Sequence, residues 1–282
     1  MAIVVAVTNM KGGVGKTTLT ANIGHCLSFV YGKKVLLVDV DPQFNLTQYC
    51  MKEAAYDKIL KDKNQGTVFD ILVPDSMSVP KVIGSKSVQK EQVFSHVLRD
   101  KLDLVPSSMK LIDFIDQRKS GSERLLSKYI EKQKDKYNFI FIDCPPTSTI
   151  LSRAAYLSSD AYIIPMGMDY FSVMGIPLLQ KDINEFSETY GVDIKGIGII
   201  RTRYLDWTTV AKKHKEIVEK FSNALKIPLF KSSFTQRQDV QNALSNRQFI
   251  LEYQNNSTAA NDIKAITKEF LERVEKWQEG KK

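Results

Sequence analysis

A stretch of glycine, lysine and threonine near the start of the chain has the composition of a phosphate-binding loop. Residues 9–18 read N-M-K-G-G-V-G-K-T-T and lie between a short apolar run at residues 2–7 and a helical pattern that begins at Leu19. Glycines let the backbone wrap a phosphate, the N–H groups of a new helix point at it, and a lysine adds positive charge. The stretch therefore predicts a nucleotide site between a strand and a helix.

This loop differs from the common pattern G-x-x-x-x-G-K-[ST] at its first position, where Met10 replaces glycine. The end of the pattern is present. We expect Lys16 to reach the terminal phosphates of the nucleotide and Thr17 to offer its hydroxyl to Mg²⁺. The residues expected around the phosphates are Lys11, Gly12, Gly13, Val14, Gly15, Lys16, Thr17 and Thr18.

The second lysine of the loop, Lys11, has two interpretations. Because Lys16 already serves the phosphates, Lys11 is a candidate to reach the nucleotide of another subunit, as an arginine finger does. The alternative is a solvated surface lysine. The spacing of the residues leaves both interpretations open.

Three aspartates follow or end predicted buried strands. Asp39 and Asp143 end such strands, and Asp41 comes two residues after the first of them. The carboxyl ends of parallel strands face the phosphate site in this class of sheet. Asp143 suits a water-mediated contact to Mg²⁺, Asp39 is a candidate to support the metal, and Asp41 is the better candidate to orient the attacking water. Asp41-Pro42 by itself is an ordinary turn signal, but three aspartates on one edge favour a site.

Strand and helix patterns alternate along the chain, which favours an α/β fold. Strands are predicted at residues 2–8, 35–39, 102–106, 139–143, 161–165 and 194–200, and helices at 17–30, 67–72, 122–134, 176–190, 206–225 and 257–277. We expect one domain over residues 1–282, with a mostly parallel central sheet, helices on both faces and the fold of a P-loop NTPase. Residues from about 51 to 100 are less regular, and 74–90 read as an exposed excursion.

The composition fits a soluble protein with acidic partners. Of 282 residues 43% are hydrophobic, and the net charge of +8 favours nucleic acid, nucleotide or anionic membrane. Three cysteines without C-x-x-C spacing predict neither a disulfide framework nor a zinc site. With no apolar run long enough to span a bilayer, we expect a cytoplasmic protein.

Together these motifs resemble the deviant-Walker ATPases of the ParA/MinD family. The matching stretches are Lys11-Gly12-Gly13-Val14-Gly15-Lys16-Thr17-Thr18, Asp39-Val40-Asp41-Pro42-Gln43 and Ile142-Asp143-Cys144-Pro145-Pro146. Asp41-Pro42-Gln43 followed by Asn45 and Thr47 is similar to the partition branch, ParA and Soj. That branch is also matched by Leu104-Val105-Pro106-Ser107-Ser108, Pro165, Tyr170-Phe171, Gly175 and Leu251-Glu252-Tyr253. The resemblance covers nearly the whole chain apart from about 51–100.

The resemblance implies an ATPase that uses ATP and Mg²⁺ and forms an ATP-sandwich homodimer. Lys11 then matches the lysine that contacts the partner subunit's nucleotide, Asp41 the water-positioning aspartate and Thr17 the magnesium ligand. The adenine pocket of the family is usually built from the loop after the sixth strand, here around Arg201-Thr202-Arg203, and from the segment after Phe230, so the resemblance assigns Arg201 and Thr202 to it. The resemblance further implies slow hydrolysis stimulated by a centromere-binding, ParB-type protein on the cargo of plasmid or chromosome partition.

Residues 195–247 are strongly basic, with eleven Lys or Arg against four Asp or Glu. Lys212, Lys213 and Lys215 on one predicted helix offer several phosphate contacts, which would bind DNA without regard to sequence and in a salt-sensitive manner. A solvated helix face is the alternative. The family's arginine pair is only partly matched, with Arg237 shifted by one position and Asp239 at the place of the second arginine. We expect a nucleoid-associated protein.

Three other classes share the loop and remain alternatives. A MinD-like membrane-surface ATPase needs a terminal amphipathic helix, but the apolar stripe of residues 257–277 is more typical of core packing. We therefore expect no stable membrane association. An iron–sulfur reductase needs a second suitable cysteine beside Cys144, and a capsule-type tyrosine kinase needs a tyrosine cluster near the end, where only Tyr253 lies.

Overall fold

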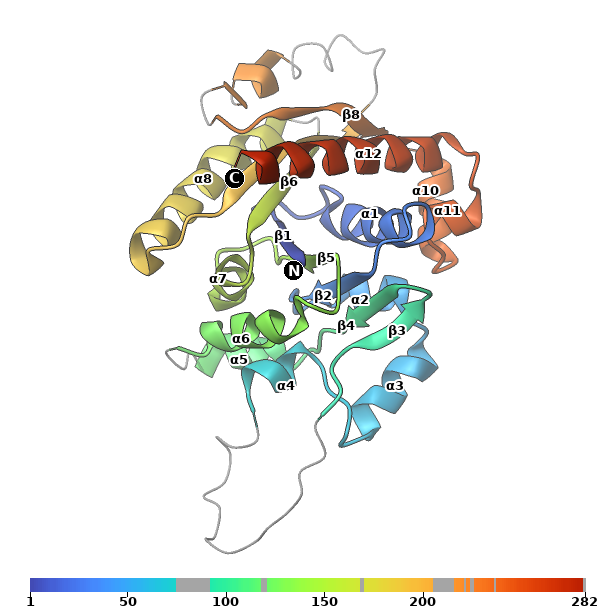
Figure 1. Ribbon diagram of the computed structural model, residues 1–282, viewed down its shortest axis with the longest axis vertical. Coiled ribbons are helices and arrows are strands. Elements are labelled where there is room, and N and C mark those ends of the chain that lie inside the picture. Colours follow the sequence, from blue (N-terminus) through green and yellow to red (C-terminus); the bar gives the residue numbers. More distant parts are fainter. Residues whose placement is uncertain are drawn as a thin grey trace, which may run out of the picture.

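The computed structural model describes residues 1–74, 92–117, 121–167, 170–204, 216–220, 222–223, 226–235 and 237–280. Within them the strands form one sheet in the order β3-β4-β2-β5-β1-β6-β7-β8 (Figure 1). Neighbouring strands are parallel except β3 and β4, which are antiparallel. The strands are β1 (Ile3–Val7), β2 (Val35–Asp39), β3 (His96–Arg99), β4 (Leu102–Val105), β5 (Phe139–Asp143), β6 (Ala161–Gly167), β7 (Lys195–Tyr204) and β8 (Leu229–Thr235). The predicted mostly parallel sheet is confirmed.

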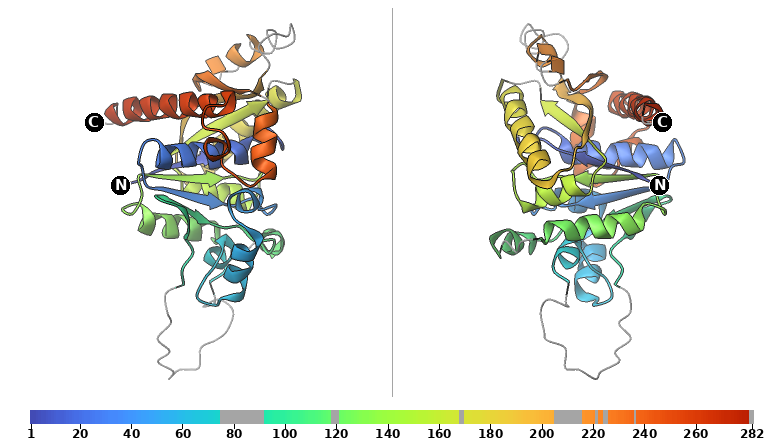
Figure 2. Two further views of the ribbon diagram at one scale, coloured as in Figure 1. Left: turned by 90° about the vertical axis from the view of Figure 1, so that its right-hand side faces the viewer. Right: turned by 60° about the vertical axis from the view of Figure 1, so that its left-hand side comes forward.

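Helices cover both faces of this sheet. Figure 2 shows α1 and α12 on one side and α6 on the other. The helices are α1 (Lys16–Phe29), α2 (Asn45–Cys50), α3 (Glu53–Lys61), α4 (Val68–Leu72), α5 (Leu111–Gln117), α6 (Glu123–Gln133), α7 (Ile150–Leu157), α8 (Tyr170–Tyr190), α10 (Gln238–Ser245), α11 (Ile250–Tyr253) and α12 (Thr258–Glu279).

Each face of the sheet has its own hydrophobic core, because successive side chains of a strand point to opposite faces. In β1, Val5 and Val7 pack against α1 and α12, whereas Val4 and Ala6 pack on the side of α6, α7 and α8. All five residues of β1 are buried. A strand buried on both faces has no polar alternation, which is why its sequence is a continuous apolar run.

The helices and strands that the sequence does not predict are short or lie at the edges of the sheet. The irregular stretch contains α3, α4 and the antiparallel edge strand β3. Helix α4 is the one that the sequence predicts there, and Asp70 accepts hydrogen bonds from the backbone N–H (2.7 Å) and the hydroxyl (2.9 Å) of Thr67 at its start. Helix α8 begins at Tyr170, six residues before its predicted start, and holds Pro177 inside. Nearly all of the predicted excursion, and most of the predicted helix at 206–225, lie outside the described residues.

Candidate nucleotide site

The predicted phosphate loop lies where β1 ends and α1 begins. Val7 is the last residue of the strand and Lys16 the first of the helix. Gly13 and Gly15 have φ angles of 74° and 88°, in the left-handed region that glycine adopts without strain. Gly12 and Gly13 are exposed. The loop therefore presents bare backbone to solvent in front of a helix N-terminus, which is the arrangement that binds phosphate.

Buried polar side chains hold this loop from behind. The Asn9 amide donates to the carbonyl of Pro165 (2.7 Å) and its oxygen accepts from the backbone N–H of Lys11 (2.9 Å). The Thr202 hydroxyl donates to the carbonyl of Val14 (2.7 Å). Thr202, which the family resemblance assigns to the adenine pocket, thus contacts the loop itself. These bonds fix the loop against β6 and β7.

Lys16 is buried beside the carboxylates of the site. Only 7% of it is exposed, and its ammonium donates to the carbonyl of Lys11 at 2.9 Å. Burial lowers the pKa of Lys16, while the nearby Asp143 and Asp41 act in the opposite direction. The lysine is therefore held inside the loop, within the same small space that the phosphates would occupy.

Asp143 lies next to the loop because β5 pairs with β1 in parallel, with Asp143 level with Val7. One carboxylate oxygen accepts from the Thr17 hydroxyl at 2.7 Å and the other from the Thr20 hydroxyl at 3.2 Å. Complete burial raises the pKa of Asp143 to about 7, against the opposing effects of the Thr17 hydrogen bond and of Lys16. A hydroxyl and a carboxylate are oxygen ligands of the kind that Mg²⁺ prefers, so these residues fit that ion.

Asp39, level with Asp143 on the adjacent strand, contacts a different set of groups. One of its oxygens accepts from the backbone N–H (2.8 Å) and the hydroxyl (2.7 Å) of Thr47, and the other from the N–H of Asp41 (3.2 Å). Burial, with Asp143 nearby, raises its pKa well above the usual value. Both oxygens are thus engaged by protein donors, which hold α2 and the turn at Asp41 in place.

Asp41 lies at the wall of the site. Its carboxylate accepts from the backbone N–H of Gln43 at 2.9 Å, and its carbonyl accepts from the Ser107 hydroxyl at 2.7 Å. Burial raises its pKa, opposed by the Gln43 hydrogen bond and by Lys16. The side chain that the sequence assigns to the attacking water is therefore held in one orientation.

A pocket of about 330 Å³ joins these elements. It is lined by Gly12, Gly13, Gly15, Lys16, Thr17, Thr18, Asp41, Gln43, Asn45, Tyr49, Pro146 and Leu244. The predicted loop and Asp41 thus come together. Pro146, Gln43 and Asn45 lie in motifs that the resemblance quotes, so a sequence signal existed for them. Tyr49 and Leu244 carry no such signal, because only the fold brings them to the pocket.

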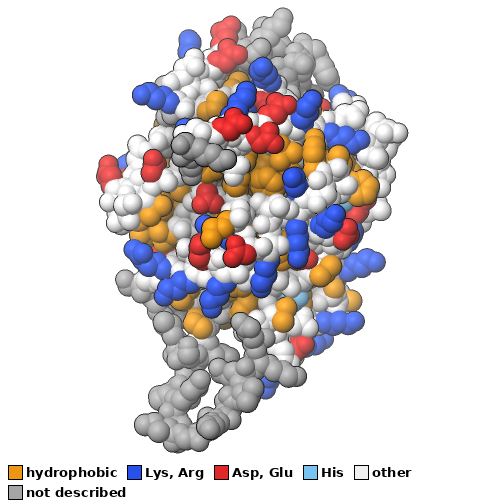
Figure 3. Space-filling view, in the orientation of Figure 1, with side chains coloured by type: hydrophobic (Ala, Val, Ile, Leu, Met, Phe, Trp, Pro, Cys, Tyr) orange, Lys and Arg blue, Asp and Glu red, His pale blue; other side chains and the backbone are white. Residues whose placement is uncertain are grey.

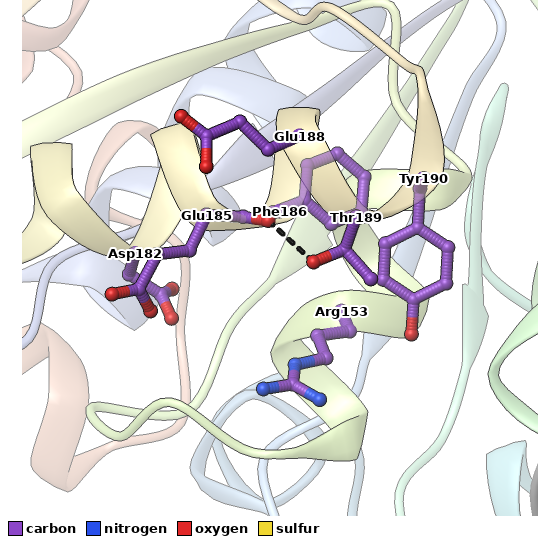
Figure 4. A pocket seen from close by; sticks show the side chains of 7 residues that line it. All are labelled: Arg153, Asp182, Glu185, Phe186, Glu188, Thr189 and Tyr190. Atoms are coloured by element: carbon purple, nitrogen blue, oxygen red, sulfur yellow. Dashed lines mark hydrogen bonds between the residues drawn. The ribbon is translucent and has the colours of Figure 1, made fainter.

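A second pocket, of about 230 Å³, lies between α7 and α8 (Figure 4). Asp182, Glu185 and Glu188 line it, with Arg153 opposite them. Three carboxylates repel an anion, so this pocket does not suit a nucleotide phosphate. Asp182 accepts a hydrogen bond from Ser148, two residues after Pro146 of the first pocket.

The remaining predicted contacts lie apart from this centre. The Arg201 guanidinium is buried and donates to the carbonyl of Lys231 at 2.9 Å, between β7 and β8. Arg237 is exposed, and its Nε donates to the Thr235 hydroxyl at 3.1 Å. Lys212, Lys213 and Lys215 lie outside the described residues. On the face shown in Figure 3 the acidic and basic side chains are interspersed, so the described part of that face is not a continuous basic surface.

The last helix packs its apolar stripe into the core. Ile263, Ile266, Phe270 and Val274 of α12 are buried against the sheet and α1. Among the described residues no helix has the length and the apolar character needed to cross a bilayer. The stripe is thus unavailable for the membrane contact that a MinD-like surface ATPase requires.

A parallel sheet with a glycine-rich loop after its central strand, followed by a helix and flanked by strand-end aspartates, defines a P-loop nucleoside triphosphatase. A family model described as an AAA domain matches residues 2–195. The chain is 30% identical over 271 residues to the virulence plasmid ParA family protein pGP5-D of Chlamydia psittaci, which covers 95% of this chain and 94% of that protein. The chain belongs to the ParA/Soj family of partition ATPases.

Two further comparisons concern the family and the fold. The sporulation initiation inhibitor protein Soj of Bacillus subtilis (strain 168) is 33% identical over 221 residues, 78% of this chain and 80% of Soj. The structure of an ATP complex of a Cyanothece McdA variant superposes with a TM-score of 0.77 at 18% identity, over 97% of this chain and 96% of that chain. At this identity the second likeness shows the shared fold.

Proposed function

We propose that this partition ATPase hydrolyses ATP with Mg²⁺ in a nucleotide-dependent homodimer that binds DNA without sequence preference. The observation that carries the proposal is the pocket itself. It holds the glycine loop, Lys16, Thr17 and Asp41 around one space, with Asp143 directly behind Thr17. Lys16 contacts the terminal phosphates, and Asp41 orients the water that attacks the γ-phosphate.

Thr17 and Asp143 are the residues that would hold the metal, with Asp39 behind them. When bound, Mg²⁺ neutralises charge that develops on the phosphates. The Thr17 hydroxyl, which donates to Asp143 at 2.7 Å, has lone pairs to offer as a ligand. Asp39 holds α2 and Asp41 in place through its hydrogen bonds. It therefore supports the site through these neighbours.

Lys11 reaches the nucleotide of the second subunit in this proposal. Its backbone is held at both ends, by Asn9 and by Lys16. Its side chain is half-buried at the outer end of the loop. These two hydrogen bonds fix the backbone of Lys11 at the start of the loop, and a fixed lysine at this position supports a contact made across a dimer interface. Arg201 and Thr202 remain predicted neighbours of the adenine.

The basic segment supplies the DNA contacts, through Lys212, Lys213, Lys215 and Arg237. Its excess of positive charge favours phosphate binding that weakens with salt. A ParB-type protein on the cargo stimulates the slow hydrolysis and so releases the dimer from DNA. We accordingly infer a protein of the cytoplasm, at the nucleoid.

The catalytic roles are tested by ATP turnover of Lys16→Ala and Asp41→Ala, which we expect to fall by about 100-fold or more. Lys33→Ala and Asp57→Ala change exposed residues of the same types and serve as matched controls. Unchanged turnover in either site variant would show that the catalytic assignment is wrong.

DNA binding is tested by retention of random duplex DNA with ATP and Mg²⁺ over a series of salt concentrations, with anionic liposomes in parallel. We expect retention on DNA that weakens as salt rises. Binding to liposomes without binding to DNA would favour the membrane-surface function instead.

A further inference from the structure

Helix α10 connects the nucleotide pocket with a predicted DNA contact. Leu244, near its C-terminal end, lines the pocket, and Arg237 is its N-cap. A helix of eight residues is about 12 Å long at 1.5 Å per residue. Because its backbone hydrogen bonds hold it together, such a helix moves as a unit. A displacement of Leu244 would therefore also displace Arg237.

A hydrogen-bonded turn fixes the C-terminal end of α10. The N–H of Gln248 donates to the carbonyl of Ala243 and that of Arg247 to the carbonyl of Leu244, both at 3.0 Å. This is the Schellman pattern, which requires a left-handed residue at the position of Arg247, where φ is 51°. The carbonyl of Gln248 is thus held at a fixed place relative to Leu244.

That carbonyl is bound by a side chain of the nucleotide pocket. The Tyr49 hydroxyl donates to the carbonyl of Gln248 at 2.7 Å and accepts from the Asn22 amide at 3.2 Å. The Asn22 amide also donates to the carbonyl of Thr18 (2.8 Å), and its oxygen accepts from the N–H of Ile250 (2.8 Å). Asn22 has no exposed surface and Tyr49 only 6%. A buried network therefore joins α1, α2 and the turn after α10.

Helix α2, which carries Tyr49, is also attached to the catalytic edge. Its Thr47 holds Asp39 through two hydrogen bonds, and its first residue, Asn45, lines the pocket. A shift of Asp41 or of its neighbours on nucleotide binding would move this six-residue helix. The hydroxyl of Tyr49 is the group through which that shift reaches the turn at Gln248.

We propose that Tyr49 is a positioning residue that couples occupancy of the nucleotide pocket to the position of α10. Through Arg237, this coupling sets the difference in DNA affinity between the ATP-bound and ADP-bound forms. The part that concerns DNA rests on the proposed function, whereas the coupling of the pocket to α10 does not. The two parts can therefore be tested separately.

The coupling is tested by hydrogen exchange of the full chain with Mg²⁺ and either a non-hydrolysable ATP analogue or ADP. Tyr49→Phe keeps the ring, which packs edge-on against Phe249 at 5.9 Å, and removes only the hydroxyl. Tyr253→Phe is the matched control, because among the described residues the Tyr253 hydroxyl has no hydrogen-bond partner. We expect the analogue to slow exchange of residues 243–250 in the wild type and in Tyr253→Phe, and this nucleotide-dependent difference to be lost in Tyr49→Phe. An undiminished difference in Tyr49→Phe, or no difference in the wild type, overturns the proposal.

The DNA part is tested on the same three proteins by the ratio of the dissociation constants for random duplex DNA in the ADP and ATP-analogue forms. We expect Tyr49→Phe to reduce this ratio about fivefold, the factor that corresponds to one net hydrogen bond. A full ratio in Tyr49→Phe overturns the role of Tyr49 in setting DNA affinity. If the wild type shows the exchange difference but no nucleotide-dependent DNA binding, the coupling is supported and the proposed DNA function fails.

Discussion

The ends of β2 and β5 carry the same residue at the same level of the sheet, yet the two aspartates have different surroundings. Asp39 is bound by two backbone N–H groups and one hydroxyl, all from the turn and helix that follow β2. Asp143 is bound by the hydroxyls of Thr17 and Thr20 on α1. A backbone N–H only donates and cannot turn away, whereas a hydroxyl rotates and also accepts.

This difference separates a structural carboxylate from one that can exchange partners. Each oxygen of Asp39 accepts from a fixed backbone N–H, so that carboxylate holds the chain around Asp41. The hydroxyls at Asp143 can release it and bind a metal ion or a phosphate. Two strand ends that look alike in sequence therefore differ in their hydrogen-bond partners, and this difference is the basis of the positioning role that we propose for Asp39 and the metal-binding role that we propose for Asp143.

The largest effect that this comparison predicts is on turnover of Asp143→Asn. The amide still fits two rotatable hydroxyls, so the fold should persist, while loss of the negative charge weakens the hold on Mg²⁺. We expect ATP turnover at limiting Mg²⁺ to fall on the order of 100-fold, with a higher Mg²⁺ requirement. Magnesium titration of the ATPase and thermal unfolding measure both quantities. A loss of stability without a change in Mg²⁺ requirement would reverse the assigned roles.

Turnover should also depend on pH through Asp143. Its pKa of about 7 lies above the usual value of 3.8. At pH values between these two, the folded protein without nucleotide therefore keeps a proton that the unfolded chain has released. Turnover at subsaturating Mg²⁺ should rise with pH through about 7 as the carboxylate forms.

The same shift acts on stability with the opposite sign. A carboxyl whose pKa is raised by folding loses stability as pH rises between the two values, so the contribution of Asp143 to stability should fall between about 4 and 7. Asp143→Asn removes this dependence, which pH-dependent unfolding of the nucleotide-free protein would show. Identical pH profiles in both proteins would contradict the assignment.

Asp39→Asn should act mainly on stability. Whichever way the amide is turned, its NH₂ group faces an N–H donor, of Thr47 or of Asp41. An unsatisfied buried donor costs about 1–3 kcal/mol, which we expect to exceed the gain from removing a buried carboxyl. Denaturant unfolding measures the loss, with turnover at saturating Mg²⁺ as the comparison. Stability equal to the wild type would mean that removing the buried carboxyl stabilises the fold as much as the unsatisfied donor destabilises it.

The smallest effect is expected for Thr20→Val. Its hydroxyl lies 3.2 Å from the carboxylate of Asp143 and 2.9 Å from the carbonyl of Lys16. The contact with Asp143 is therefore the longer and weaker of its two hydrogen bonds. We expect a loss of about 0.5–1 kcal/mol in the free energy of unfolding and a higher pKa of Asp143, seen as a shift of the turnover profile to higher pH. An unchanged pH profile of turnover would show that, of the two threonines, Thr17 alone influences the pKa of Asp143.

Much of the site could be predicted from local patterns. A continuous apolar run, a glycine-rich loop and a helical stripe are each encoded within about ten residues, and the aspartates at the ends of β2 and β5 are adjacent to the strands that position them. The short elements were missed for the same reason. Helix α2 has six residues and α11 has four, and neither length is enough to display a periodicity.

The amino-acid sequence by itself determined the loop, the helix behind it, the parallel strands and the family, because these depend on residue types at short spacing. Only the tertiary structure decided what surrounds them. Thr202 reaches the loop across 188 residues and Ile250 reaches Asn22 across 228. Contacts over such separations depend on how the strands are ordered in the sheet and how α1 packs against the C-terminal segment. Local spacing carries no information on either, so the difference between Asp39 and Asp143 and the connection through Tyr49 emerged only from the fold.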